Sequence, residues 1–216
     1  MKAIQIDNTQ KPQRLSLVEM MTPAPGDGEV LIEVRAAGVT PSELTWYPTS
    51  YTKTGSPRNR AIPGHEFSGT VTALSRGAEG FSIGDEVYGM NDWFADGATA
   101  EFCIARPEQI TLKPKSLAHT EAATVPIGTL TAWQGLFGRA NLQPSERVLI
   151  HGAAGAVGLF ATQFARLRGA TVLAATSGRS VDFVKQLGAD MVWDYKSTRF
   201  EEVVGQVDVV FDTVGD

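Results

Sequence analysis

Two patterns of hydrophobic and polar positions divide this chain near its middle. In the first half, short runs alternate between apolar and polar residues, as half-buried β-strands do, and turns rich in Gly, Pro and Asp separate them. This alternation predicts strands over residues 1–7, 29–36, 67–74 and 101–105. From Thr120 the apolar positions take a helical spacing through Thr131, Trp133 and Leu136, so we expect a β domain over residues 1–120.

Apolar strands and amphipathic helices alternate in the second half. A strand begins at Val148, and further strands are predicted at residues 171–175, 191–193 and 207–212. Helices are predicted between them, at residues 157–167, 180–187 and 199–204. The order β-α-β-α-β-α-β is typical of an α/β fold with a doubly wound parallel sheet, which we place over residues 121–216.

The turn after the first of these strands consists of small residues. Gly152 begins it and Gly158 opens the helix, with the spacing G-x-x-G-x-x-G, which is looser than the usual dinucleotide fingerprint. An ordinary tight turn has the same composition, but the strand, turn and helix of a βαβ unit favour a site for a pyrophosphate on the helix N-terminus. The predicted cofactor-binding residues here are Ala154, Gly155, Ala156 and Val157.

The end of the second strand of this sheet indicates which nicotinamide cofactor is preferred. NAD enzymes place an acid about 20 residues beyond the turn, whereas a basic residue accepts the 2′-phosphate of NADP. Here the first carboxylate is Asp182, inside the next helix, while Ser177 and Arg179 offer a hydroxyl and a planar donor fork. We therefore predict NADP(H), although Arg179 also fits a solvated loop cation, and we expect Ser180 to be a helix N-cap.

Composition narrows the class of protein. A net charge of −5 and a pI near 5.3 argue against a nucleic-acid partner. No run of 18 apolar residues exists and the N-terminus does not read as a signal peptide, so we expect no membrane association and a cytoplasmic location. Cys103, the single cysteine, excludes an intramolecular disulfide, and its place in a predicted strand makes it a core residue.

Several further motifs occur in an order that resembles a known family. They are Gly28-Glu29-Val30-Leu31-Ile32, Ala37-Gly38-Val39, Gly64-His65-Glu66-Phe67-Ser68-Gly69, Gly84-Asp85-Glu86-Val87, Leu130-Thr131-Ala132-Trp133, His151-Gly152-Ala153-Ala154-Gly155 and Asp208-Val209-Val210-Phe211-Asp212. The chain resembles the medium-chain dehydrogenase/reductase superfamily, and within it the zinc-free quinone oxidoreductase branch that includes ζ-crystallin. The resemblance implies a GroES-like β domain followed by a Rossmann domain, an active site in the cleft between them, and a homodimer.

The same resemblance implies roles for individual side chains. Tyr51 matches a tyrosine near the nicotinamide and is the candidate catalytic residue, while Thr40 stands where that branch has an asparagine. Thr131 matches a threonine that contacts the nicotinamide region, and Tyr195 a tyrosine near the adenosine phosphate. Each residue also has a plain alternative: Tyr51 as a cover for apolar surface, Thr131 as a helix-interior residue and Tyr195 as a loop aromatic.

The motif around His65 supplies a metal ligand in the zinc alcohol dehydrogenases. Catalytic zinc needs three protein ligands, and Thr40 and Ile127 stand where that branch has cysteines. Neither side chain replaces a thiolate, so we expect no metal and a hydrogen-bonded His65.

These observations predict an NADPH-dependent, zinc-independent oxidoreductase that transfers hydride to a quinone or an α,β-unsaturated carbonyl (enone or enal) substrate. An enoyl-thioester reductase of the same superfamily and a non-catalytic NADPH-binding protein stay open as alternatives. The chain stops just after the fourth Rossmann strand, which would leave an apolar sheet edge exposed, so we expect the sheet to be truncated.

Overall fold

The chain divides into two units, residues 1–126 and residues 127–216. The computed structural model describes residues 1–9 and 13–215, and Asp216 lies outside the described residues. Each unit has buried hydrophobic clusters of its own, so each is described by itself.

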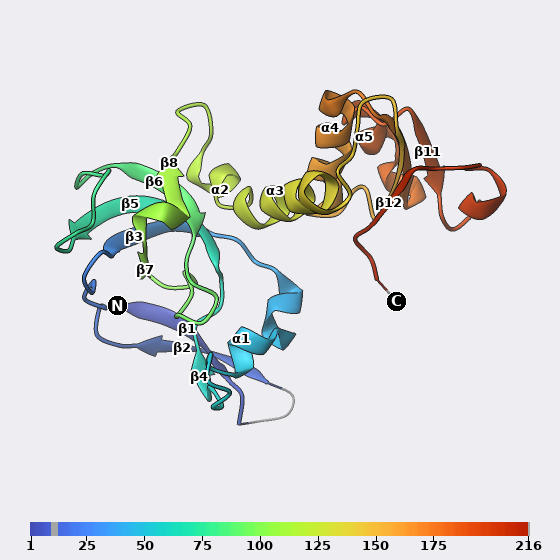
Figure 1. Ribbon diagram of the computed structural model, residues 1–216. Coiled ribbons are helices and arrows are strands. Elements are labelled where there is room, and N and C mark those ends of the chain that lie inside the picture. The colour runs from blue at the N-terminus through green and yellow to red at the C-terminus, as the bar shows by residue number, and fades with distance from the viewer. Residues whose placement is uncertain (10–12, 216) are drawn as a thin grey trace. The chain divides into compact units, whose positions relative to one another are not determined.

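Two antiparallel sheets build the first unit (Figure 1). The larger has the strand order β7-β3-β5-β6-β8 and comprises β3 (Val30–Ala37), β5 (Glu66–Leu74), β6 (Glu86–Met90), β7 (Phe102–Ala105) and β8 (Ile110–Leu112). The smaller has the order β2-β1-β4 and comprises β1 (Lys2–Asp7), β2 (Arg14–Glu19) and β4 (Arg60–Ala61). The four strands predicted in this half are confirmed as β1, β3, β5 and β7, each bound within one residue of its prediction.

The core of this unit lies on one face of the larger sheet. Val30 and Ile32 alternate into it from β3 and join Phe67 of β5 and Val87 of β6 in one buried cluster. Cys103 of β7 is 2 % exposed within the same cluster, which confirms it as a core residue.

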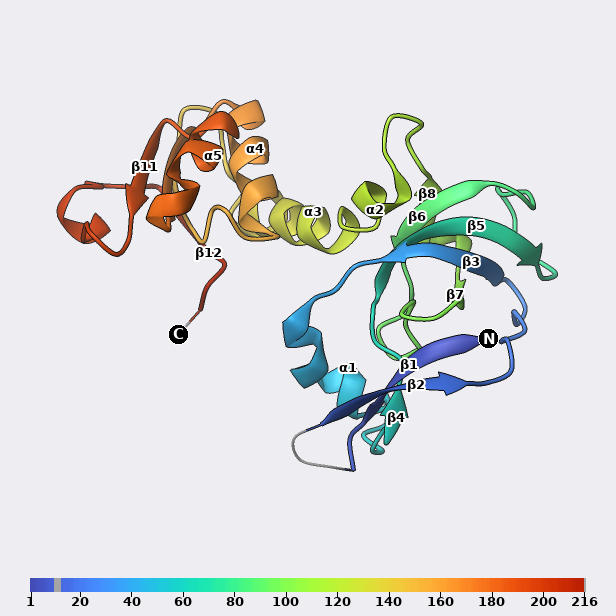
Figure 2. The same cartoon turned by 180° about the vertical axis from the view of Figure 1, so that it is seen from behind.

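Short helices carry the connections of the first unit. These are η1 (Pro41–Thr45), α1 (Tyr47–Ser50), η2 (Pro107–Gln109) and α2 (His119–Ala122). Figures 1 and 2 show α1 beside β1 and β4. Asn8, which follows β1, holds it there, because Asn8 Nδ2 donates to the carbonyl oxygens of Thr49 (3.1 Å) and Arg58 (2.8 Å).

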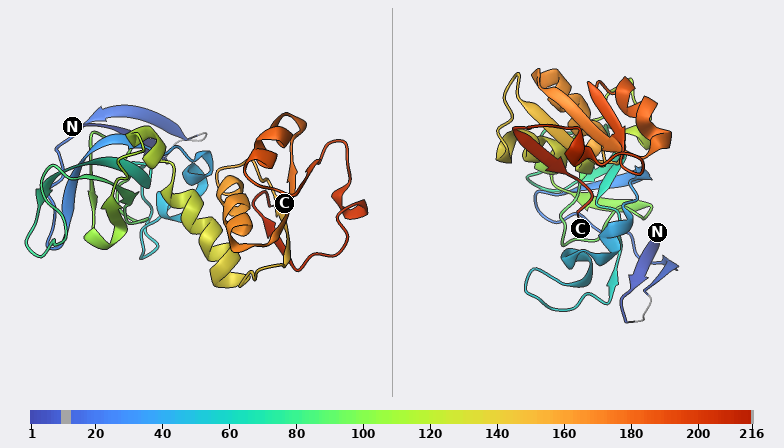
Figure 3. Two further views of the ribbon diagram at one scale, coloured as in Figure 1. Left: turned by 90° about the horizontal axis from the view of Figure 1, so that it is seen from above. Right: turned by 90° about the vertical axis from the view of Figure 1, so that its right-hand side faces the viewer.

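A four-stranded parallel sheet forms the second unit, with the order β11-β10-β9-β12. Figure 3 shows the strands and helices of this unit in yellow to red. The strands are β9 (Arg147–His151), β10 (Thr171–Thr176), β11 (Met191–Asp194) and β12 (Val209–Asp212). The connecting helices α4 (Gly158–Arg168) and α5 (Val181–Gln186) follow β9 and β10, and two right-handed crossovers in one direction place them on the same face. This is the expected Rossmann arrangement of parallel strands and helices.

Several predicted boundaries in this unit were wrong. The helix expected over residues 199–204 is only the 3₁₀ turn η5 (Phe200–Glu202). Among the side chains described in this segment, the acidic residues and Val203 are exposed and Val204 is buried, which gives a helix little apolar surface to pack. The last strand begins at Val209 rather than at residue 207. Val207 instead precedes the strand and packs, partly buried, against the small cluster around Leu149 and Leu173.

Ser180 occupies the N-cap position of α5 but does not cap it with its side chain. A 3₁₀ turn, η4 (Gly178–Ser180), precedes the helix, and the Ser180 hydroxyl lies 3.4 Å from that of Ser177 instead. The expected capping bond is therefore absent from this helix start.

The helical stretch expected from Thr120 to Leu136 is divided into α2, α3 (Pro126–Trp133) and the π-helical η3 (Gln134–Arg139). Gly135 lies in the π-helical segment, and a Cβ there would lie 2.2 Å from the ring of Phe211 on β12, so close packing requires the glycine. No helix among the described residues is long and apolar enough to cross a membrane.

Candidate functional site

The glycines of the turn between β9 and α4 are fixed by close contacts. Gly152 has φ of 69°, a backbone conformation that L side chains rarely adopt, and a Cβ there would lie 2.5 Å from Thr213 Oγ1. A Cβ on Gly158 would lie 2.2 Å from the carbonyl oxygen of Gly152. Both glycines therefore bring the start of α4 closer to the strand ends than any side chain would allow.

The residues between these glycines present backbone rather than side chains. Gly155 and Ala156 are exposed, and the hydrogen bonds among the described residues leave the N–H groups of Ala156 and Val157 unused. α4 begins at the next residue, so these donors stand at the partially positive end of an 11-residue helix. An anionic group is the partner such a turn favours.

A cavity of about 750 Å³ opens beside this turn. It lies at the carboxyl ends of the four parallel strands, where the chain order reverses between β9 and β12, which is the usual ligand position in such sheets. The lining residues are His151, Gly152, Ala154, Gly155, Ala175, Thr176, Ser177, Tyr195, Asp212, Thr213, Val214 and Gly215.

Asp212, the last residue of β12, lines this cavity. Its Oδ1 accepts the N–H of Val214 at 2.9 Å, and this hydrogen bond lowers the pKa of Asp212 although burial acts to raise it. The hydroxyl of Thr213 donates to the carbonyl oxygen of His151 at 2.7 Å and ties the end of β12 to that of β9.

A second cavity of about 470 Å³ shares Ser177 and Tyr195 with the first. Ser177, Gly178, Arg179, Asp194, Tyr195 and Lys196 line it. Of the residues predicted to bind the 2′-phosphate and adenosine, all three (Ser177, Arg179 and Tyr195) therefore come together here. Asp194 and Lys196 were missed, although both lie at the end of a predicted strand, where parallel sheets gather their ligand-binding side chains.

Thr131 stands apart from these cavities. It lies on α3 with its side chain exposed, next to the buried Ala132, and it lines neither cavity of the second unit. Its predicted contact with the nicotinamide region stays a prediction.

Thr40 and Tyr51 bracket one loop of the first unit. Thr40 precedes η1, where its carbonyl oxygen accepts the N–H of Glu43 at 2.9 Å. Tyr51 follows α1, is 42 % exposed, and stacks on Tyr47 with 4.9 Å between ring centroids. Tyr47 also meets Phe94 edge to face, so the predicted catalytic tyrosine lies at one end of a series of three aromatic rings.

A buried Glu43–His65 contact supports this loop. Glu43 and His65 are each 2 % exposed, and Glu43 Oε1 faces His65 Nδ1 and also accepts the N–H of Gly64 at 2.8 Å. His65 Nε2 lies 3.4 Å from the carbonyl oxygen of Ala95, and the ring of Trp93 covers the imidazole at 5.3 Å. His65 is therefore hydrogen-bonded, as expected.

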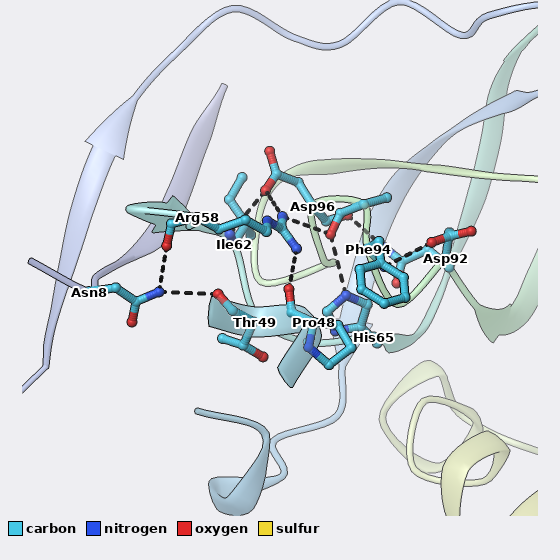
Figure 4. A network of polar contacts seen from close by, with 12 residues as sticks. Asn8, Pro48, Thr49, Arg58, Ile62, His65, Asp92, Phe94 and Asp96 are labelled. Carbon is cyan, nitrogen blue, oxygen red and sulfur yellow. Dashed lines mark hydrogen bonds and ion pairs between the residues drawn. The ribbon is translucent and has the colours of Figure 1, made fainter. Parts of the chain in front are cut away.

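Arg58 extends the network around His65 (Figure 4). Its guanidinium donates to the carbonyl oxygens of Pro48 (2.8 Å) and Ala95 (3.0 Å) and to Asp96 Oδ1 (3.0 Å). Asp96 Oδ1 also accepts the N–H of Ile62 at 3.2 Å. The loop with Thr40 and Tyr51 is thus fastened to the strands by polar groups that have partners.

The described residues contain no group of three His, Cys, Asp or Glu side chains placed to hold a metal ion. Both ring nitrogens of His65 face acceptor oxygens, and Thr40 offers a hydroxyl in place of a thiolate. These residues do not fit the three-ligand site of a catalytic zinc.

Two family models match the chain. Residues 26–148 match the alcohol dehydrogenase GroES-like domain, and residues 156–216 match a domain described as zinc-binding dehydrogenase. Together they cover most of both units.

Relatives with related names align over most of the chain. It is 35% identical to a probable zinc-binding oxidoreductase, mitochondrial, of Arthroderma benhamiae over 93% of its length and 64% of the relative's. It is 34% identical to a 2-methylene-furan-3-one reductase of Solanum lycopersicum, over 88% of its length and 50% of that relative's. The chain thus spans about half to two thirds of these relatives.

A solved structure, that of the quinone oxidoreductase from Coxiella burnetii, superposes with a TM-score of 0.88. The two chains are 32% identical, and the match covers 100% of this chain and 69% of the other.

Proposed function

Because the chain belongs to the medium-chain dehydrogenase/reductase superfamily, in its quinone oxidoreductase branch, we propose that it is an NADPH-dependent oxidoreductase that reduces quinones or α,β-unsaturated carbonyl compounds without zinc. The observation that carries the proposal is the cavity at the carboxyl ends of the four parallel strands, with a bare turn on one side and two cations beyond it.

The residues present fit a dinucleotide. The turn from Ala154 to Val157 would hold the pyrophosphate, because the N–H groups of Ala156 and Val157 are unused and the turn has no large side chain. Ser177, Arg179 and Tyr195 would hold the adenosine 2′-phosphate, because they line one cavity that adjoins the larger one. Thr40 and Thr131 are the proposed contacts on the nicotinamide side, on the strength of the family resemblance.

When bound, the reduced nicotinamide supplies a hydride to the carbon acceptor. The protein then has to stabilise the negative charge that develops on the acceptor's carbonyl oxygen. Tyr51 is proposed for this task, because its exposed phenol Oη is able to donate a hydrogen bond or a proton to that oxygen. The stacking on Tyr47 limits the movement of the ring and so orients the hydroxyl.

The choice of acceptor follows from the side chains at hand. Alcohol oxidation by this superfamily's zinc enzymes relies on a Lewis acid that lowers the alcohol's pKa, and the ligand set for it does not fit here. A conjugated carbonyl or a quinone is already activated for hydride addition, so these acceptors are proposed. The resemblance also leads us to propose a homodimer, which sedimentation would test. We further propose a cytoplasmic location, which cell fractionation would test.

A paired titration of the purified protein with NADPH and NADH tests the cofactor assignment. Tryptophan emission reports binding, and we expect a clear preference for NADPH that Arg179→Ala removes by weakening NADPH binding about 10- to 100-fold, the effect of one charge-assisted hydrogen bond. Equal losses for both cofactors would refute the 2′-phosphate role of Arg179.

Turnover tests the acceptor. NADPH consumption is followed with a quinone, an enone and an enoyl thioester, each with and without a chelator, and we expect activity on the first two that chelation leaves unchanged. Stoichiometric zinc in the active protein would overturn the metal-free mechanism. Preference for the thioester would favour an enoyl-thioester reductase, and NADPH binding without any turnover would indicate a binding protein.

A further inference from the structure

The smaller cavity of the second unit contains two cations that come from different loops. Arg179 lies in the turn after β10, and Lys196 lies two residues beyond the end of β11. Both side chains are exposed, and neither takes part in an ion pair among the described residues. Cations without a protein partner in a shared cavity are available to an anionic ligand.

A backbone hydrogen bond joins the two loops, from the Tyr195 N–H to the carbonyl oxygen of Thr176 at 3.1 Å. Within the second loop, Asp194 Oδ1 accepts the N–H of Lys196 at 3.0 Å. Gly178 lets the loops approach, because a Cβ there would lie 2.6 Å from Asp194 Oδ2. Lys196 is therefore fixed at its backbone beside the turn that carries Arg179, while its side chain stays free to turn.

The chemistry of a 2′-phosphate calls for more than one cation. A phosphate monoester carries about −1.5 to −2 charges at neutral pH, and a single guanidinium balances only part of this. The cavity also contains the carboxylate of Asp194, which opposes an anion. With Arg179 alone, the charges of Arg179 and Asp194 would cancel and leave no net attraction for the phosphate, so a second cation is needed.

We propose that Lys196 is the second cation for the 2′-phosphate and thus a residue that determines the preference for NADPH over NADH. This inference rests on the proposed cofactor site and adds a residue to it. Because Ser177 and Tyr195 line both cavities, one ligand can extend from the larger cavity into the smaller and reach Lys196 with its phosphate.

The test is a calorimetric titration of the intact chain with NADPH, NADH and 2′,5′-ADP. For Lys196→Gln we expect about tenfold weaker binding of NADPH and of 2′,5′-ADP, because one charge-assisted contact is lost, and unchanged binding of NADH. Asp194→Asn keeps an oxygen for the Lys196 N–H but removes the opposing charge, so it is expected to strengthen binding of NADPH and 2′,5′-ADP.

Lys185→Gln is the matched control, because Lys185 is an exposed lysine of α5 that lines neither cavity. Its NADPH affinity should equal that of the unaltered chain. Added salt should weaken NADPH binding less in Lys196→Gln than in the unaltered chain, because one screened ion pair is missing.

The outcomes separate this inference from the proposed function. If the unaltered chain binds NADPH and NADH equally, the cofactor assignment fails and Lys196 has no such role. If it prefers NADPH, Arg179→Ala abolishes the preference and Lys196→Gln leaves it intact, only the role of Lys196 is overturned. A loss of NADPH and NADH affinity to the same extent in Lys196→Gln also overturns it, because that pattern indicates damage to the fold.

Discussion

Truncating Glu43 should destabilise the first unit more than any exposed acidic residue does. The change Glu43→Ala removes the acceptor of two buried donors, the Gly64 N–H and His65 Nδ1, from a site where both carboxylate and imidazole are 2 % exposed. Each buried donor left without an acceptor costs about 1–3 kcal/mol, and breaking a buried pair from one side costs about 3–5 kcal/mol. We therefore expect a loss of about 4 kcal/mol in the free energy of unfolding.

The variant Glu43→Gln separates the two causes of this loss. Both donors face the same oxygen, Oε1, and glutamine keeps an oxygen at that position while removing the charge. Its expected cost is about 1 kcal/mol, the difference between a charged and a neutral acceptor. Glu33→Gln is the control, because its pair with Arg35 is solvated on both sides and is worth at most about 1 kcal/mol.

Urea unfolding followed by tryptophan emission measures these differences, and Trp93 reports the site directly because its ring lies on His65. At about 2–4 °C per kcal/mol, the alanine variant should also melt about 8–16 °C lower. Hydrogen exchange at the Gly64 amide gives a local readout, and its protection should fall in Glu43→Ala and survive in Glu43→Gln. Equal losses in the two variants, or full protection of Gly64 in the alanine variant, would refute the reasoning.

Three further outcomes are expected. Gly158→Ala should lower the melting temperature and weaken NADPH binding, because its Cβ would lie 2.2 Å from a backbone carbonyl oxygen, whereas Gly138→Ala, which meets nothing within 4 Å, should leave both unchanged. Burial raises the pKa of the Cys103 thiol, so a disulfide reagent should modify it only after unfolding. The hydrogen bond from Lys113 lowers the pKa of Glu86 below its ordinary value of 4.5. The charged Glu86 therefore stabilises the folded state fully above pH 4.5, and this contribution is lost as the pH falls through the lowered pKa. Urea titrations at pH 3 to 6 should show a smaller acid loss in Glu86→Gln.

The parallel sheet was predictable because its two central strands, β9 and β10, are buried on both faces and read as apolar runs between helices. The first unit shows where this reasoning ends. β6 contains Gly89, which reads as a break in a strand, yet a Cβ there would lie 2.2 Å from the carbonyl oxygen of Gln109. Close approach of β8 requires the glycine, and only the tertiary structure reveals that neighbour. β2 was missed because the alternation around Leu15 and Leu17 is short, and both leucines are exposed rather than part of the core.

The candidate site divides in the same way. The bare turn from Gly152 to Gly158 was visible in the sequence because its chemistry is local, a backbone that side chains must not cover. The cation Lys196 was not, because its meeting with Arg179 depends on β10 and β11 being neighbours in the sheet. The Glu43–His65 pair likewise joins residues 22 positions apart through a fold that periodicity does not describe.

A second histidine of the first unit looks at first like part of a hydrolase. His119 Nδ1 lies 2.7 Å from the hydroxyl of Ser68, and its Nε2 lies 3.3 Å from Glu86 Oε1, the order of a nucleophile, base and acid. Ser68, however, is 0 % exposed and donates its hydroxyl proton to the carbonyl oxygen of Val87 at 2.9 Å. A nucleophile that no substrate reaches cannot act, so the cluster instead fastens α2 to β5 and β6.

The two histidines of the first unit are therefore both committed to structure, His65 between Glu43 and the Ala95 carbonyl, and His119 between Ser68 and Glu86. An imidazole held on both sides is poorly placed to shuttle protons to a substrate. We therefore keep Tyr51, which is 42 % exposed, as the proposed proton donor. Its proposed role is to protonate the carbonyl oxygen of an acceptor that receives hydride from the reduced nicotinamide, so the proposed step requires neither histidine.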